Sequence, residues 1–89
     1  MEVHFVDATE GFPQSYGDQI RVLTIPDKKD PKRIVTNVLC RYFVSGLEVS
    51  FMKNPHDADE SFEDALIWAK SFARLHGIVH VYAANLTKA

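Results

Sequence analysis

The strongest constraint on this chain is the stretch from Asp59 to Gly77, DESFEDALIWAKSFARLHG, whose apolar residues recur at the spacing of one helix face. Ser61 is the favoured N-cap, with Asp59 as the alternative, and Gly77 suits the left-handed residue that ends a helix. Residues 78–82 follow at once and are mostly β-branched or aromatic, which predicts a strand. The apolar helix face therefore needs a sheet to pack on. Its residues are Phe62, Ala65, Leu66, Trp68, Ala69, Phe72, Ala73 and Leu75.

Length and composition narrow the class of protein. The chain of 89 residues suits one domain, and 46% apolar with 25% charged residues is typical of soluble globular proteins. No apolar run approaches the length of a membrane-spanning helix, so we expect no membrane partner. Cys40 is the single cysteine, which excludes an internal disulfide, and we expect a cytoplasmic location in a cell or host cell. The mildly acidic net charge of −2 disfavours nucleic acid as a partner.

Three further strands are expected. Residues 1–7 alternate apolar and polar side chains, with Val3 and Phe5 facing inward. Residues 19–25, QIRVLTI, are almost wholly apolar and end before a proline, which stops a strand. Residues 47–53, LEVSFMK, alternate most clearly. In that last strand the inward side chains are Leu47, Val49 and Phe51.

Residues 31–44 fit two patterns. As a helix they begin after the N-cap Asp30 with Pro31 at the first position, and one face carries only apolar residues. As a strand they turn tightly at Ser45 and Gly46 into the next strand, and their β-branched content favours this version. We weight cap and periodicity above propensity and predict the helix. Its apolar face is Ile34, Val35, Val38, Leu39, Tyr42 and Phe43; the strand would instead align Ile34, Thr36, Val38, Cys40, Tyr42 and Val44.

The predicted fold is an α/β (α+β) two-layer sandwich with element order ββαβαβ. Two helices lie on one face of a four-stranded mixed sheet, and right-handed crossovers make the second, third and fourth strands parallel neighbours. The alternative is a ββββαβ meander with one helix. Either way, residues 1–89 form a single small globular domain.

Two loops carry candidate binding residues. The loop 8–18 holds two aromatic residues, Phe12 and Tyr16, which either cover the core or form a binding loop. The loop 26–33 is basic, and it is either a solvated connector or an anion contact. Its cationic residues are Lys28, Lys29, Lys32 and Arg33.

The remaining patterns do not predict catalysis or a metal site. Carboxylates near the start of the long helix are explained by the helix dipole, and Phe62 and Trp68 occupy positions where a calcium loop needs glycine and glutamate. Gly77 separates His76 from His80, so these imidazoles would not share a helix face. We expect no metal, no cofactor and no catalytic residue, and an enzyme is disfavoured. The acidic cluster comprises His56, Asp57, Asp59, Glu60, Glu63 and Asp64.

Ile67 projects from the polar face of the predicted helix, and Trp68 lies at the boundary of its apolar face. An aromatic residue beside an apolar one with a polar rim is how many protein contacts are built. We therefore predict a non-catalytic protein-interaction or regulatory module of the small inhibitor or adaptor type, whose partner is another protein or a second copy. The predicted surface is Ile67, Trp68, Phe12 and Tyr16. The alternative is a small-molecule-binding domain or small oligomeric enzyme that uses loops 8–18 and 26–33.

Overall fold

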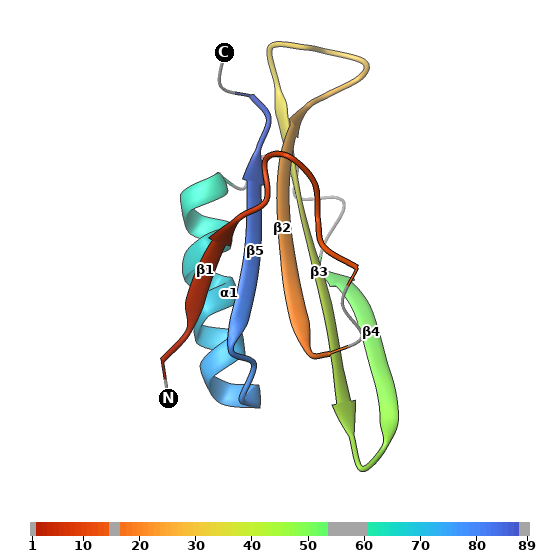
Figure 1. Ribbon diagram of the computed structural model, residues 1–89. Coiled ribbons are helices and arrows are strands. Elements are labelled where there is room, and N and C mark those ends of the chain that lie inside the picture. The colour runs from red at the N-terminus through yellow and green to blue at the C-terminus, as the bar shows by residue number, and fades with distance from the viewer. Residues whose placement is uncertain (1, 15–16, 54–60, 88–89) are drawn as a thin grey trace.

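The computed structural model describes residues 2–14, 17–53 and 61–87, which form a five-stranded sheet with one helix on one face (Figure 1). The strands lie in the order β1-β5-β2-β3-β4. The elements along the chain are β1 (His4–Asp7), β2 (Gln19–Pro26), β3 (Ile34–Val44), β4 (Leu47–Lys53), α1 (Phe62–His76) and β5 (His80–Asn85).

The sheet is mixed, and its two long connections lie on opposite faces. β5 is parallel to both β1 and β2, whereas β2, β3 and β4 are antiparallel neighbours. The connection from β4 to β5 is α1, and the connection from β1 to β2 is a loop that crosses the other face (Figure 1). This loop is held there by Arg21, whose guanidinium donates to the Pro13 carbonyl at 2.9 Å. Because the two connections travel in opposite directions, right-handed crossovers require opposite faces.

The predicted helix over 31–44 is wrong, because these residues form strand β3. Ser45 and Gly46 have φ values of 50° and 81° and join Val44 to Leu47 in a two-residue hairpin, the geometry of a type I′ turn. Every second residue of β3 from Thr36 to Cys40 is buried, which is the period of a strand and not of a helix. Tertiary pairing with two neighbouring strands outweighs the helical cap signal.

The predicted sheet of four strands with two helices is corrected accordingly. The element order is that of the ββββαβ alternative, although β1 does not join a meander but pairs with β5 at the far edge. The expected parallel arrangement of the second, third and fourth strands is also wrong, since β2, β3 and β4 alternate in direction. What stands is a mixed α+β domain with one helix layer on one sheet.

The ends of α1 follow the sequence signals. Ser61 Oγ accepts a hydrogen bond from the Asp64 amide at 3.1 Å, which confirms the N-cap. Gly77 has φ 71°, and the Ile78 amide donates to the Ala73 carbonyl at 2.8 Å to close the last turn. The chain then enters β5, as predicted, although the strand begins at His80 and not at residue 78.

The core lies between α1 and the middle of the sheet. The helix residues that are fully buried are all alanines, Ala65, Ala69 and Ala73, so the helix backbone approaches the sheet closely. The larger apolar residues of α1 flank this row and are partly exposed. Leu75, predicted to face inward, is 80% exposed. The sheet side of the core includes Ile20, Val22, Val38, Cys40 and Val81.

Candidate interaction surface

The outer part of the β3–β4 hairpin is largely exposed. β2 pairs with β3 only as far as Arg41, so the hairpin from residue 42 to residue 49 extends past the end of β2 (Figure 1). Val44 is 52% exposed and Leu47 is 73% exposed. Five of the eleven large apolar residues that are exposed in the described part of the chain lie in this hairpin: Phe43, Val44, Leu47, Phe51 and Met52.

β4 is also an open edge of the sheet. No described strand lies beyond it, and only two of its seven residues are partly buried. In a two-residue hairpin the residues that flank the turn form a hydrogen-bonded pair, so alternate residues of β4 from Leu47 onward bond to β3. The backbone N–H and C=O groups of Glu48, Ser50 and Met52 therefore point away from β3. Such an edge, without proline, is a template for another strand.

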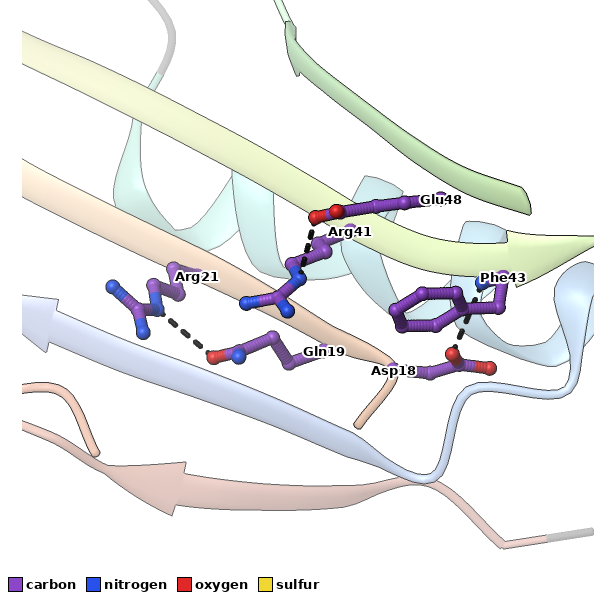
Figure 2. Close-up of polar contacts among 6 residues, drawn as sticks. All are labelled: Asp18, Gln19, Arg21, Arg41, Phe43 and Glu48. Carbon is purple, nitrogen blue, oxygen red and sulfur yellow. Dashed lines mark hydrogen bonds and ion pairs between the residues drawn. The ribbon is translucent and has the colours of Figure 1, made fainter. Parts of the chain in front are cut away.

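Polar contacts on the face opposite α1 hold the hairpin in place (Figure 2). The Phe43 amide points toward β2, beyond the end of that strand, and donates to Asp18 Oδ1 at 3.1 Å. Arg41 Nε lies 2.8 Å from Glu48 Oε1, which joins β3 to β4 across their shared edge. The guanidinium carbon of Arg41 is 5.9 Å from the centre of the Phe43 ring. These contacts hold the two strands of the hairpin to each other and to the start of β2.

An aromatic cluster centred on Phe72 supports the hairpin from the helix side. Phe72 stacks on Trp68 at 5.0 Å and on His76 at 4.2 Å between ring centres, along one side of α1. Two rings of the sheet approach Phe72 edge-on, Phe51 of β4 at 5.6 Å and Tyr42 of β3 at 5.8 Å. These pairs join the helix directly to both strands of the hairpin.

The residues of the predicted surface lie on different sides of the molecule. Trp68 belongs to the aromatic cluster, where the ammonium of Lys53 lies 4.8 Å from its ring centre. Ile67 is 66% exposed and lines a hollow of about 330 Å³ between α1 and β1, together with Phe5, Glu63, Leu66 and Lys70. Phe12 lies on the face opposite α1, with its ring centre 5.4 Å from the Arg21 guanidinium carbon. Tyr16 lies outside the described residues.

In the part of the chain that the structure describes, the hollow that Phe12 lines does not reach the loop 26–33. Phe12 lines a hollow of about 210 Å³ over the sheet, together with Arg21, Leu23, Asn37, Leu39 and Met52. The loop 26–33 contributes nothing to it, because this loop lies at the end of the sheet opposite the hairpin turn (Figure 1).

The basic loop is organised by its own carboxylates. Asp27 Oδ1 accepts from the Lys29 amide at 3.0 Å, and Asp30 Oδ1 accepts from the Lys32 amide at 3.1 Å. Arg41 lies eight residues from Arg33 along β3 and is engaged by Glu48. An anion or nucleic-acid contact would need the basic residues to lie close together. Arg41 is paired with Glu48 and does not join the basic residues of the loop. The exposed cationic residues of the loop are Lys28, Lys29, Lys32 and Arg33.

The groups with catalytic or metal-binding chemistry are dispersed. Cys40 is fully buried, and burial raises the pKa of its thiol to about 12, so the thiol stays protonated. His76 stacks on Phe72 of α1, whereas His80 stacks on Tyr82 of β5 at 6.0 Å. Within residues 2–14, 17–53 and 61–87, no three His, Cys, Asp or Glu residues gather as a metal site would require.

Of the acidic cluster, Glu63 and Asp64 occupy the first turn of α1, and the other four members lie outside the described residues. The described part of the chain contains no helix long and apolar enough to cross a membrane.

The sequence reasoning missed the exposed residues of the hairpin turn, chiefly Val44 and Leu47. The signal that could have found them is the dipeptide of Ser45 and Gly46, flanked on both sides by alternating apolar residues. No protein-family model matches this chain, and no curated protein or solved structure shows a significant match to it. Any function therefore has to be argued from the geometry alone.

Proposed function

We propose that this chain is a non-catalytic protein-interaction module, of inhibitor or adaptor type, that binds its partner through the β3–β4 hairpin. The observation that carries the proposal is the concentration of exposed apolar side chains on a hairpin that extends past the rest of the sheet. Val44, Leu47 and Phe51 lie on the α1 side of the hairpin, and Phe43 and Met52 lie on the other side. Exposed apolar residues gathered on one element of a small domain typically mark an interaction site, because leaving them in water is unfavourable.

The hairpin is well suited to binding because it is already ordered. The Asp18 contact, the ion pair of Arg41 with Glu48 and the aromatic cluster around Phe72 fix both strands. A partner therefore does not have to order this segment, and little conformational entropy is lost when it binds. No described strand pairs with the outer backbone groups of β4, so another strand can extend the sheet there by β-augmentation.

A second candidate contact surface is the hollow between α1 and β1, which Ile67 lines. With Phe5 and Leu66 this residue gives the hollow an apolar floor, and Glu63 and Lys70 provide a charged rim. This combination resembles the apolar centre and polar rim of a protein interface. It is smaller than the hairpin surface and carries fewer exposed apolar residues.

Capture experiments with matched variants compare the two surfaces. The bait is the tagged full-length chain in extract of the cells that encode it, and retained proteins are quantified by mass spectrometry. We expect Leu47→Lys to remove the partner, because it places a charge in the apolar contact, while Ile67→Asp and Leu75→Asp retain it. All three residues are highly exposed, so the fold should survive, as circular dichroism would verify.

The possible results separate the two surfaces. Loss of the partner with Ile67→Asp alone would move the contact to the hollow between α1 and β1. Retention of the same proteins by all three variants would overturn the proposal for both surfaces.

A further inference from the structure

We infer that the β4 edge binds a second copy of this chain, through antiparallel pairing of the two β4 strands about a two-fold axis at Ser50. The inference rests on the proposed function of the β3–β4 hairpin and specifies its partner. It would extend each five-stranded sheet into one continuous sheet across the dimer.

The backbone of β4 is arranged symmetrically for such pairing. Glu48, Ser50 and Met52 direct their N–H and C=O groups away from β3, and Ser50 is the middle one. Two antiparallel copies centred on Ser50 place each outward residue opposite an outward residue of the other copy. Ser50 meets Ser50 of the second copy and Glu48 meets Met52, so every outward donor and acceptor of these residues is paired.

The side chains of β4 are compatible with the same register. On the α1 side of the sheet, Val49 of one copy lies opposite Phe51 of the other, and a β-branched residue paired with an aromatic one is favourable across strands. Leu47, the most exposed residue of the hairpin, lies opposite Lys53. No two like charges face each other, because Glu48 is opposite Met52 and Lys53 is opposite Leu47.

Other registers pair fewer groups. Centring the strands on Val49 matches Glu48 with Ser50 but leaves the outward groups of Met52 without a partner. Centring the strands on Phe51 places Glu48 opposite residue 54, which lies outside the described residues, so no described residue pairs with the groups of Glu48 in that register. The symmetric register about Ser50 is therefore the one that uses the whole edge.

A cysteine placed on the two-fold axis tests the register directly. In a hydrogen-bonded antiparallel pair the Cα atoms are about 5.5 Å apart, within the range of roughly 4.4 to 6.8 Å that a disulfide spans. Ser50→Cys should therefore form an interchain disulfide under mild oxidation. Met52→Cys is the matched control, because its two copies would lie about 13 Å apart. Cys40 is buried and does not compete.

The expected result is roughly tenfold or more disulfide dimer with Ser50→Cys than with Met52→Cys, because pairing raises the effective concentration of the two thiols. A mixture of Glu48→Cys and Met52→Cys should give the mixed disulfide, since these residues face each other in the proposed register. Equal cross-linking of Ser50→Cys and Met52→Cys would overturn the inference.

Ser50→Pro tests whether the edge itself holds the dimer. The Ser50 amide points away from β3, so proline removes the central donor of the dimer without breaking the β3–β4 ladder. Native mass spectrometry and light scattering should show a dimer for the wild type and for Ser50→Ala, and a monomer for Ser50→Pro. Circular dichroism tests whether the proline variant is folded. If this variant is unfolded, the cysteine cross-links alone test the proposed register.

The outcomes separate this inference from the proposal it rests on. A wild-type monomer at all concentrations, without a Ser50→Cys cross-link, would overturn the two-fold dimer. If Leu47→Lys still removed a captured protein in that case, the hairpin would remain the contact surface and its partner would be a different chain. A dimer that Ser50→Pro leaves intact, with the proline variant folded, would overturn the assignment to the β4 edge.

Discussion

At the scale of single residues, Thr24 and Thr36 face each other across β2 and β3 beneath α1. Their hydroxyl groups are fully or almost fully buried and lie 2.8 Å apart, which is a hydrogen bond between register partners. A buried hydroxyl is tolerated in a core when it has a partner, and its removal from water is costly when it does not. This pair therefore lets two polar residues sit among valines.

Thr36→Val should destabilise the protein by about 1–3 kcal/mol, because the Thr24 hydroxyl would lose its partner while remaining buried. The double variant Thr24→Val with Thr36→Val should recover much of that loss, since neither hydroxyl remains. Urea denaturation of the wild type, both single variants and the double variant gives the coupling free energy. Additive effects of the two substitutions would contradict the role of the hydrogen bond.

Cys40 should react slowly with an alkylating reagent in the folded protein and rapidly in denaturant. Burial raises the pKa of its thiol from 9.0 to about 12, so the folded state holds its proton where the unfolded state loses it. The resulting contribution to stability is therefore present below about pH 9 and is lost as the pH rises toward 12. Alkylation rates measured by mass spectrometry between these pH values check both statements. Native alkylation as fast as that of the unfolded chain would contradict them.

At the scale of elements, the β3–β4 hairpin depends on a side chain outside it. β2 pairs with β3 only from Gln19 onward, and the side chain of Asp18, the residue before the strand, supplies the acceptor that the backbone of a longer strand would have provided to Phe43. The type I′ turn supplies the twist that keeps both strands paired beyond that point. The end of the hairpin near its turn is thus held by the Asp18 carboxylate, by the ion pair of Arg41 with Glu48 and by the aromatic cluster around Phe72.

Asp18→Ala should loosen the hairpin, because the Phe43 amide loses its acceptor where β2 no longer covers β3. We expect faster hydrogen exchange at the Phe43 amide and a loss of about 0.5–1.5 kcal/mol in stability. Asp18→Asn keeps a side-chain oxygen acceptor and is the matched control. Unchanged exchange at Phe43 in the alanine variant would show that the contact does not hold the hairpin.

At the scale of the whole molecule, the row of Ala65, Ala69 and Ala73 sets the distance between the helix and the sheet. Large residues in this row would lift α1 from β2 and β5, where Ile20, Val22 and Val81 are fully buried in the same core. The larger apolar residues of α1 instead lie beside the row, where Phe72 contacts the hairpin on one side and Phe62 and Leu66 line a hollow beside β1 on the other.

Ala69→Leu should destabilise the protein by about 1–3 kcal/mol through overpacking, because the site between helix and sheet has no room for a larger side chain. Ser71→Leu is the control on the exposed face of the same helix, where a change within about 0.5 kcal/mol is expected. Thermal and urea unfolding measure both. Equal effects at the two positions would mean that the alanine row does not set the packing distance.

The sequence by itself determined the elements whose signals are local. Ser61 and Gly77 mark the ends of α1 because capping depends only on neighbouring backbone groups, and the alternation in residues 47–53 predicts β4 because a strand has period two.

Only the tertiary structure decided the rest. Residues 34–44 satisfy a helical and an extended period equally well, and the choice depends on β2 and β4 being present on either side to pair with them. The position of β1 beside β5 depends on residues about 75 apart in the chain, for which one sequence contains no local signal. The exposure of the hairpin also depends on how the strands pair. A side chain there is exposed because the neighbouring strand ends, and not because of its residue type.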